Sequence, residues 1–361
     1  PNWDVEDVAL SPDGSVLAWS VNEDGISRIY LRDMRRGRSI SAPPLPEGLI
    51  SNLHFSPDGS KLAFYFETAT HPEELFVWDL KSKRLTQLTQ NFLGGIPEGH
   101  MVKPKLIRYK SFDGREIPAW VFVPHGASSA NKVPAVVSPH GGPEWQERPW
   151  YSPLYQFLLN RGIAILAPNF RGSTGYGKSY QRLIWRDWGG GELRDIEHAV
   201  LWLQKQTWVD KERIGIFGGS FGGFATLSAV TRLPQYWRCG VDICGPSNLV
   251  TFLQTVPPFW KHLTKELVGD PDEDREFLLS RSPITYVDNV RCPLLVIQGA
   301  NDPRVVKAES DQMVERLRQR GVPVDYVVFE DEGHGLTKRV NMLKAARLIS
   351  DFLLRNLCES A

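Results

Sequence analysis

One serine in the sequence is surrounded by glycines, in the stretch IGIFGGSFGGFATLSAV of residues 214–230. The apolar run before Ser220 is typical of a buried strand, and the run after it has the apolar spacing of a helix. Gly218 and Gly222 stand two residues before and after the serine, where side chains would keep strand and helix apart. The pattern predicts a nucleophile elbow that exposes the serine hydroxyl above a sheet. Glycine-rich turns also cradle phosphates, so these residues alone leave that alternative open.

A serine hydroxyl becomes a strong nucleophile when a base removes its proton and an acid orients the base. In α/β-hydrolases the order along the chain is serine, acid, histidine. The strand-like run PLLVIQG is followed by ANDPR, which contains Asp302, and VDYVVFE is followed by DEGHG, which contains His334. We therefore predict that Ser220, Asp302 and His334 form a catalytic triad.

Each member of the triad has rivals in the sequence. His262 is the other histidine after the serine, but it lies in a helical-looking segment without a preceding strand. Among the acids, Asp242 falls inside a strand run, whereas Asp331 and Glu332 are too close to His334 along the chain to orient it from behind. Asp302 and His334 remain the best candidates.

The developing oxyanion needs hydrogen-bond donors that are already in place. One donor is the backbone N–H of Phe221, because this residue starts the helix after the serine. The loop HGGP follows an early strand-like run, and its glycines allow a backbone N–H, which we assign to Gly142, to approach a substrate closely. We interpret His140 of the same loop as a residue that stabilises the loop.

The elements that must position these residues are strands alternating with helices from about residue 100 to the end. The strands are nearly continuous apolar runs, which indicates a mostly parallel sheet that is covered on both faces. Such sheets carry their chemistry at the carboxyl ends of the strands. The predicted fold is therefore α/β, an α/β-hydrolase domain over residues 100–361. The runs are AWVFVP, PAVVSP, IAILAP, RIGIFG, CGVDIC, PLLVIQG and VDYVVFE.

The first 95 residues contain a repeat with a different pattern. Segments that begin at Leu10 and Phe55 both read as an SPDGS turn followed by two strands, with a period of about 45 residues. This period is typical of β-propeller blades, but two blades cannot close a ring. We interpret residues 1–95 as a partial β-propeller, with further blades before Pro1 or a different packing of the pair as the two explanations.

The composition of the chain indicates which binding partners and which cellular compartment to expect. Lys plus Arg and Asp plus Glu both number 42, so neither nucleic acid nor an anionic membrane is an expected partner. No apolar run approaches the roughly 20 residues that span a bilayer, and the start does not resemble a signal peptide. The four cysteines lack metal-ligand spacing. We expect a cytoplasmic enzyme that needs neither a metal nor another cofactor.

Taken together, the motifs HGGP, PNFRGSTGYG, GGGELRDI, GGSFGG, NDPR and EGHG after propeller repeats resemble the prolyl oligopeptidase family of serine peptidases, most closely its acylaminoacyl-peptidase branch. The resemblance implies the same triad and the oxyanion donors Gly142 and Phe221. It also implies that Arg304 binds a substrate carbonyl. Other branches use a tyrosine hydroxyl as an oxyanion donor, and Tyr151 keeps that alternative open.

The expected substrates are short peptides or N-acylated amino acids and peptides. Tyr176 is a candidate substrate contact, and Phe252, Phe259 and Trp260 are candidates for an apolar pocket, with ordinary burial as the alternative. A carboxylesterase with the same triad and a non-catalytic interaction protein are the alternative functions. Unpaired strand edges of a partial propeller would favour a homo-oligomer.

Overall fold

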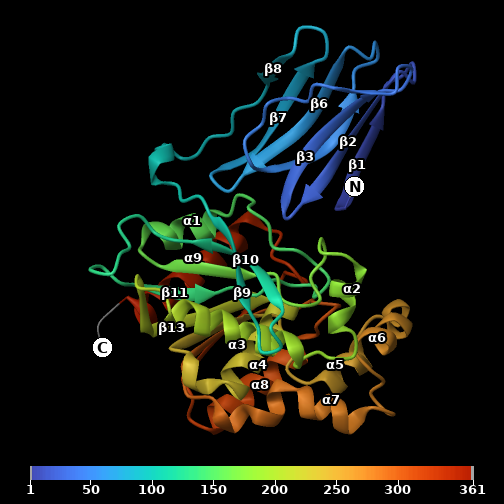
Figure 1. Ribbon diagram of the computed structural model, residues 1–361. Helices are drawn as coiled ribbons and strands as arrows, with labels where there is room; N and C mark the ends of the chain where they lie inside the picture. The colour runs from blue at the N-terminus through green and yellow to red at the C-terminus, as the bar shows by residue number, and fades with distance from the viewer. Residues whose placement is uncertain (1, 359–361) are drawn as a thin grey trace. The chain divides into compact units, whose positions relative to one another are not determined.

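The computed structural model describes residues 2–358, which divide into two compact units (Figure 1). The first unit comprises the residues up to Pro104 together with Arg148–Gln156 and Gly175–Gly177. The second unit comprises Lys105–Glu147, Phe157–Thr174 and the chain from Lys178 onward. Two short segments from the middle of the sequence thus group with the N-terminal unit.

The first unit contains two antiparallel sheets of four strands each, and in each sheet the strands follow the order of the chain. Apolar side chains from both sheets form one core, in which Phe64 and Leu62 are fully buried beside Ile29 and Trp78. This arrangement has the form of two propeller blades. The strands are β1 (Asp4–Leu10), β2 (Val16–Glu23), β3 (Ile26–Asp33) and β4 (Arg38–Ile40), then β5 (Leu49–Phe55), β6 (Lys61–Thr68), β7 (His71–Asp79) and β8 (Arg84–Gln87).

The two repeats fold alike in detail at their SPDGS turns. The carboxylate of Asp13 accepts hydrogen bonds from the hydroxyls of Ser11 and Ser15, both at 2.8 Å. Asp58 makes the equivalent contacts with the serines of the second repeat. The glycine that follows each aspartate has a positive φ, which a side chain would strain. The shared sequence therefore encodes the same turn twice.

The second unit is built on an eight-stranded sheet in the order β16-β15-β14-β13-β11-β12-β10-β9. β10 runs antiparallel to both β9 and β12, and the other neighbours are parallel. The strands β11, β12 and β15 are buried along their whole length because both faces of the sheet are covered. The strands are β9 (Lys105–Lys110), β10 (Glu116–Phe122), β11 (Val133–Val137), β12 (Ala164–Pro168), β13 (Val209–Gly219), β14 (Cys239–Ile243), β15 (Leu294–Gly299) and β16 (Val324–Phe329).

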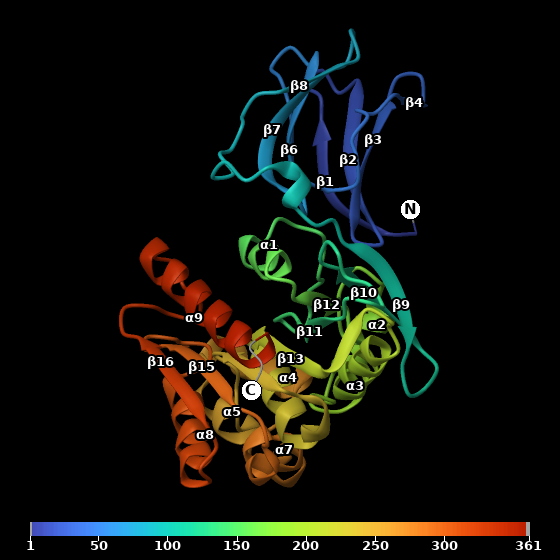
Figure 2. The ribbon, with the colours of Figure 1, turned by 90° about the vertical axis from the view of Figure 1, so that its left-hand side faces the viewer.

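Helices pack on both faces of this sheet. Figure 2 shows α9 on one side of β15 and α8 on the other, and both helices contact that strand. This mostly parallel sheet between helices confirms the predicted α/β-hydrolase fold. The α-helices are α1 (Pro153–Asn160), α2 (Lys178–Gln181), α3 (Gly191–Gln204), α4 (Phe221–Arg232), α5 (Leu249–Thr255), α6 (Lys261–Leu267), α7 (Arg275–Arg281), α8 (Lys307–Gln319) and α9 (Arg339–Leu357). The 3-10 helices are Glu98–His100, Arg182–Ile184, Pro234–Tyr236, Pro258–Trp260 and Pro283–Asn289.

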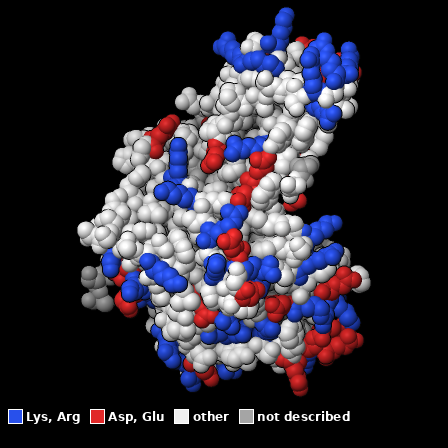
Figure 3. All heavy atoms as spheres, in the orientation of Figure 1, with Lys and Arg blue, Asp and Glu red and all other residues white. Residues whose placement is uncertain are grey.

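Charged side chains of both signs are interspersed over the face of the second unit that Figure 3 presents. No helix within residues 2–358 is long and apolar enough to cross a membrane.

The core between the two blade-like sheets gives a first prediction. Phe64 is fully buried there, so Phe64→Ala removes apolar contacts and leaves a cavity. We expect the free energy of unfolding of the first unit to fall by about 3–5 kcal/mol. The control is Phe92→Ala, because Phe92 of the same unit is 88% exposed. Denaturant titration of both variants checks this, and equal effects would contradict the shared core.

Candidate active site

The turn between β13 and α4 holds Ser220 in a conformation that few residues adopt. Ser220 has φ 56° and ψ −120°, and its N–H donates to the carbonyl of Ile243 at 2.8 Å. A Cβ atom at Gly218 would lie 2.5 Å from the carbonyl oxygen of Gly222, and one at Gly222 would collide with the carbonyl oxygen of Pro139. The glycines on either side of the serine are therefore required by close backbone contacts. This geometry is that of a nucleophile elbow.

Three side chains from three strand ends meet at this turn. Ser220 follows β13, Asp302 follows β15, and His334 follows β16. His334 Nε2 lies 2.9 Å from Ser220 Oγ, and His334 Nδ1 lies 2.7 Å from Asp302 Oδ2. The side chain of Asp302 is completely buried and that of His334 mostly so. A neutral His334 can donate from Nδ1 to the carboxylate and accept the serine proton at Nε2.

The carboxylate of Asp302 is held from its other side. Its Oδ1 accepts the backbone N–H groups of Arg304 at 2.8 Å and Val305 at 3.0 Å. These bonds leave Oδ2 directed at His334, so the acid cannot rotate without losing backbone partners.

Cys244 lies behind the histidine, and its Sγ is 3.7 Å from the carbonyl oxygen of His334. Cys244, Asp302 and His334 offer possible metal-ligand atoms that all lie within 4.8 Å of one another. Burial raises the pKa of the Cys244 thiol, which disfavours the thiolate that a metal would need. The hydrogen bonds of Asp302 and His334 to each other and to Ser220 fit proton transfer better than metal binding.

The HGGP loop lies against the elbow. A Cβ atom at Gly141 would lie 3.2 Å from the carbonyl oxygen of Gly219 and 3.6 Å from Ser220 Cβ. Gly142 has φ 119° and lines the cavity beside the serine, as does Phe221. The loop thus brings Gly142 to the side of Ser220 where Phe221 begins α4.

The side chain of His140 connects this loop to neighbouring residues of the protein. Its ring stacks on Phe170 with 4.3 Å between ring centroids, Nδ1 donates to the carbonyl of Gly141 at 2.7 Å, and Nε2 lies 2.8 Å from Ser173 Oγ. Burial lowers the pKa of His140 to about 4. The ring is therefore neutral at pH 7 and acts as part of the scaffold.

A cavity of about 290 Å³ opens beside the serine, and its lining is mainly apolar. Arg304 is the cation of the lining, and its guanidinium carbon lies 5.4 Å from the centre of the Trp260 ring. Within the described chain, no carboxylate forms an ion pair with Arg304, so the guanidinium is available to a ligand. The lining consists of Gly142, Pro143, Glu144, Trp188, Ser220, Phe221, Pro246, Phe252, Trp260, Leu263, Thr264, Leu267, Val268, Arg304, Val305 and His334.

The structure does not bring every predicted contact into this cavity. Phe252 and Trp260 line it, but Phe259 is 79% exposed and lies outside the lining, because the 3-10 turn of Pro258–Trp260 directs neighbouring side chains to different sides. Tyr151 and Tyr176 belong to the first unit, and their roles as an oxyanion donor and a substrate contact stay predictions.

Trp188 is the main lining residue that the sequence analysis missed. Its position just before the glycines of GGGELRDI was the available signal, because an aromatic residue beside a glycine turn can be directed into a neighbouring site. Leu263 and Leu267, on α6, were missed as well.

The sheet, the elbow and the Ser220–His334–Asp302 geometry define a protein of the α/β-hydrolase class. The chain belongs to the prolyl oligopeptidase family, whose model matches residues 149–360, and the resemblance predicted from the sequence is confirmed.

Two curated relatives represent different branches. The chain is 39% identical over 289 residues to dipeptidyl aminopeptidase BIII of Pseudoxanthomonas mexicana, which covers 76% of this chain and 42% of the relative. It is 27% identical over 234 residues to the acylamino-acid-releasing enzyme of Homo sapiens, covering 63% of this chain and 32% of the relative. The chain thus spans half or less of the length of these relatives.

Solved structures match nearly the whole chain. A puromycin-hydrolyzing peptidase of Mycobacterium tuberculosis has a TM-score of 0.88 at 26% identity, covering 98% of this chain and 54% of that one. An acylaminoacyl peptidase of Pyrococcus horikoshii has a TM-score of 0.86 at 27% identity, covering 99% and 57%. The two antiparallel sheets of the first unit fit the predicted partial propeller.

The buried His140 gives a pH-dependent prediction. An unfolded chain binds a proton at this residue near pH 6.5, whereas the folded chain does so only near pH 4. Between these values the unfolded state holds the extra proton, so the contribution of His140 to the free energy of unfolding decreases as the pH falls. We expect His140 to account for about 3 kcal/mol of this loss at most.

Denaturant titrations between pH 7 and 4 check the expectation. His140→Gln should have a flatter pH dependence than the unchanged protein. His262→Gln is the control, because the side chain of His262 is 90% exposed. Parallel curves for the unchanged protein and His140→Gln would contradict the assignment.

Proposed function

We propose that this chain carries the catalytic unit of a serine peptidase that hydrolyses short peptides or N-acylated amino acids and peptides. The observation that carries the proposal is the continuous hydrogen-bonded series from Ser220 Oγ through His334 to Asp302. Its position on an elbow, beside an apolar cavity, supports acyl transfer. Because the chain spans only part of the relatives it matches, the activity of the whole protein is included in this proposal.

The first half of the reaction forms an acyl-enzyme. Ser220 Oγ attacks the carbonyl carbon while His334 Nε2 takes the hydroxyl proton. The imidazolium is stabilised by Asp302, which accepts from Nδ1. The C–N bond of the tetrahedral intermediate then breaks, the leaving amine receives the proton from His334 Nε2, and the acyl group stays on the serine.

The second half repeats these steps with water in place of the serine hydroxyl. His334 accepts a proton from water, which attacks the acyl carbonyl, and returns that proton to Ser220 Oγ. The product acid leaves and the free serine is restored. The chain's own side chains account for each proton.

The oxyanion of both intermediates is assigned to two backbone donors, Phe221 N–H and Gly142 N–H. Phe221 is the first residue of α4, so its N–H has no partner within the helix and lies at the positive end of the helix dipole. Gly142 lines the same cavity, and its loop lies against Ser220. Removing one such donor typically slows an enzyme by about 10²- to 10³-fold.

The cavity favours substrates with an apolar side chain next to the scissile carbonyl. Trp188, Phe252 and Trp260 supply aromatic walls, and the N-acyl or peptide carbonyl is a suitable partner for the free guanidinium of Arg304. The names of the relatives include both dipeptidyl and acylaminoacyl peptidases, so both free and blocked amino termini are candidates.

The rate of substrate hydrolysis by the variant Ser220→Ala tests whether Ser220 is the nucleophile. We expect the variant to fold normally and to lose about 10⁴-fold or more of kcat/KM, because the serine, histidine and acid act as a unit. The control is Ser228→Ala, on the same helix but outside the cavity lining. Substrates are N-acylated, unblocked dipeptide and prolyl anilides together with a nitrophenyl ester.

The same set of anilide and ester substrates also distinguishes a peptidase from a carboxylesterase. Cleavage of the ester alone would identify a carboxylesterase, because activated esters are easier to hydrolyse than amides. Normal activity in Ser220→Ala would overturn the proposal.

Arg304 gives a separate prediction. Arg304→Met removes the guanidinium, with its hydrogen-bond donors and its contact with the Trp260 ring, but keeps an unbranched side chain at this position. We expect KM for acylated anilides to rise about tenfold, a loss typical of one hydrogen bond to a charged group. Arg347→Met is the control, since the Arg347 side chain is 85% exposed. An unchanged KM would exclude Arg304 as a substrate contact.

A further inference from the structure

A turn of three glycines, residues 189–191, connects Trp188 to the start of α3. Trp188 lines the cavity, and its ring packs edge-on against Phe221 with 4.7 Å between centroids and lies 6.1 Å from Phe252. The indole is 8% exposed, and its Nε1 has no hydrogen-bond partner in the described chain. The orientation of Trp188 therefore depends on ring packing and on the backbone that carries it.

An arginine side chain lies close to each glycine of the turn, where a Cβ atom would otherwise be. Arg232 donates to the carbonyl oxygen of Gly189, and a Cβ at Gly189 would lie 3.2 Å from its Nη1. A Cβ at Gly190 would collide with Oδ1 of Asp187 and with Nη1 of Arg281. Arginine side chains, together with Asp187 and the carbonyl oxygen of Arg281, thus occupy the space that side chains of the turn would take.

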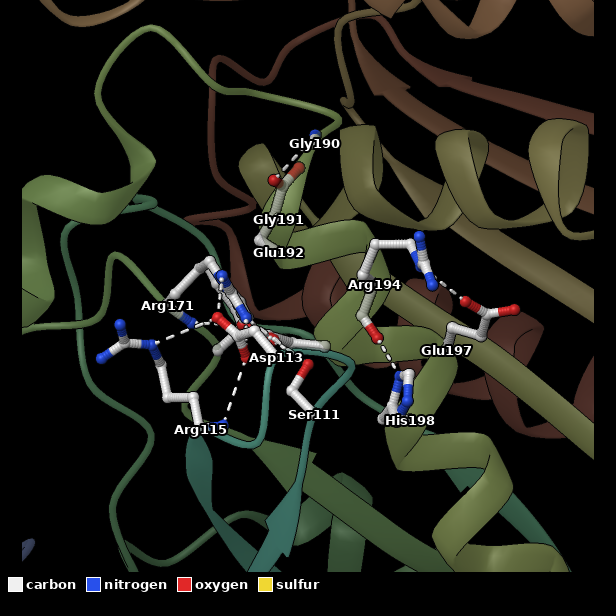
Figure 4. A network of polar contacts seen from close by, with 12 residues as sticks. Ser111, Asp113, Arg115, Arg171, Gly190, Gly191, Glu192, Arg194, Glu197 and His198 are labelled. Carbon is white, nitrogen blue, oxygen red and sulfur yellow. Dashed lines mark hydrogen bonds and ion pairs between the residues drawn. The ribbon is translucent and has the colours of Figure 1, made fainter.

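The third glycine meets a buried ion-pair network. A Cβ at Gly191 would lie 2.5 Å from Cδ of Arg171. Arg171 donates to Asp195 at 2.7 Å and to Asp113 at 3.1 Å, and Figure 4 shows its guanidinium beside Asp113. Asp195 lies on α3 and is fully buried, so Arg171 ties the start of this helix to the β9–β10 hairpin.

Two carboxylates also contact the glycine turn. Asp187 accepts the N–H of Gly191 at 2.8 Å and an Arg281 N–H at 3.1 Å. Glu192 turns back and accepts the N–H of Gly190 at 3.1 Å. The N–H of Gly189 also donates to Glu192, so the backbone N–H groups of all three glycines are satisfied inside the protein, and the cluster supports the turn.

We propose that Arg232, Arg281 and Arg171 are positioning residues that hold Trp188 in place through the glycine turn and thereby set the preference of the cavity for bulky apolar side chains. A glycine turn has no side chains with which to pack, and glycine loses more backbone freedom on folding than any other residue. The arginines supply the fixed contacts that the turn lacks. This inference rests on the proposed function, because it assigns the cavity to the substrate.

The experiment compares Arg232→Met with Arg194→Met. Arg232 donates to a carbonyl of the turn, whereas the Arg194 side chain donates to Glu197 (Figure 4) and stacks on Phe112 instead. Both variants are made with and without Trp188→Ala. The substrates are N-acyl-phenylalanine and N-acyl-alanine nitrophenyl esters, which differ only in the size of the side chain.

For Arg232→Met we expect KM of the phenylalanine ester to rise about tenfold with kcat nearly unchanged, the scale on which apolar pockets discriminate side chains. The alanine ester should be unaffected, and Arg194→Met should resemble the unchanged protein. In the Trp188→Ala background Arg232→Met should have no further effect. Arg281→Met, with the same expected pattern, is the second variant if thermal unfolding shows that Arg232→Met does not fold.

Three results would overturn the inference: equal losses for both esters, no change in either, or an effect of Arg232→Met that persists without Trp188. Failure of the unchanged protein to hydrolyse any ester would instead contradict the proposed function. The inference is then decided by equilibrium binding of N-acyl-phenylalanine and N-acyl-alanine, measured by tryptophan fluorescence with the same variants. The same loss of discrimination supports it, and its absence overturns it.

Discussion

The close approach of three backbone segments around Ser220 is the constraint on which the rest of the site depends. The end of β13, the first turn of α4 and the HGGP loop meet where Gly218 and Gly222 leave no room for a Cβ atom. This crowding holds Ser220 at a positive φ, at the point where Phe221 begins α4. One steric constraint therefore positions the serine and the start of the helix that we propose to supply an oxyanion donor.

The parallel sheet supplies the second requirement, because it aligns the carboxyl ends of β13, β15 and β16 along one edge. Asp302 and His334 are 32 residues apart in sequence, yet their side chains meet because their strands are neighbours. The hydrogen bonds from the backbone of the Asp302 loop then fix the carboxylate. The chemistry of the site thus follows from strand order and from short loops, which require few specific residues.

Local sequence was sufficient for the features that local sterics decide. The glycine spacing around Ser220, and the strand-like runs before Asp302 and His334, identified the elbow and the residues that the structure brings together. The cavity walls were harder to predict, because whether an aromatic side chain is buried depends on contacts distant in sequence. Phe259 and Trp260 are adjacent but only Trp260 lines the cavity, and Trp188 is directed there by a turn whose arginine contacts come from three separate segments.

The most direct test of the central claim is to locate a covalent adduct. After reaction with a fluorophosphonate, peptide mass spectrometry should find the phosphonyl group on Ser220, and His334→Ala should greatly slow its formation because the base is missing. An adduct on another residue, or labelling of Ser220 at an unchanged rate in His334→Ala, would contradict the assignment of Ser220 as a nucleophile activated by His334.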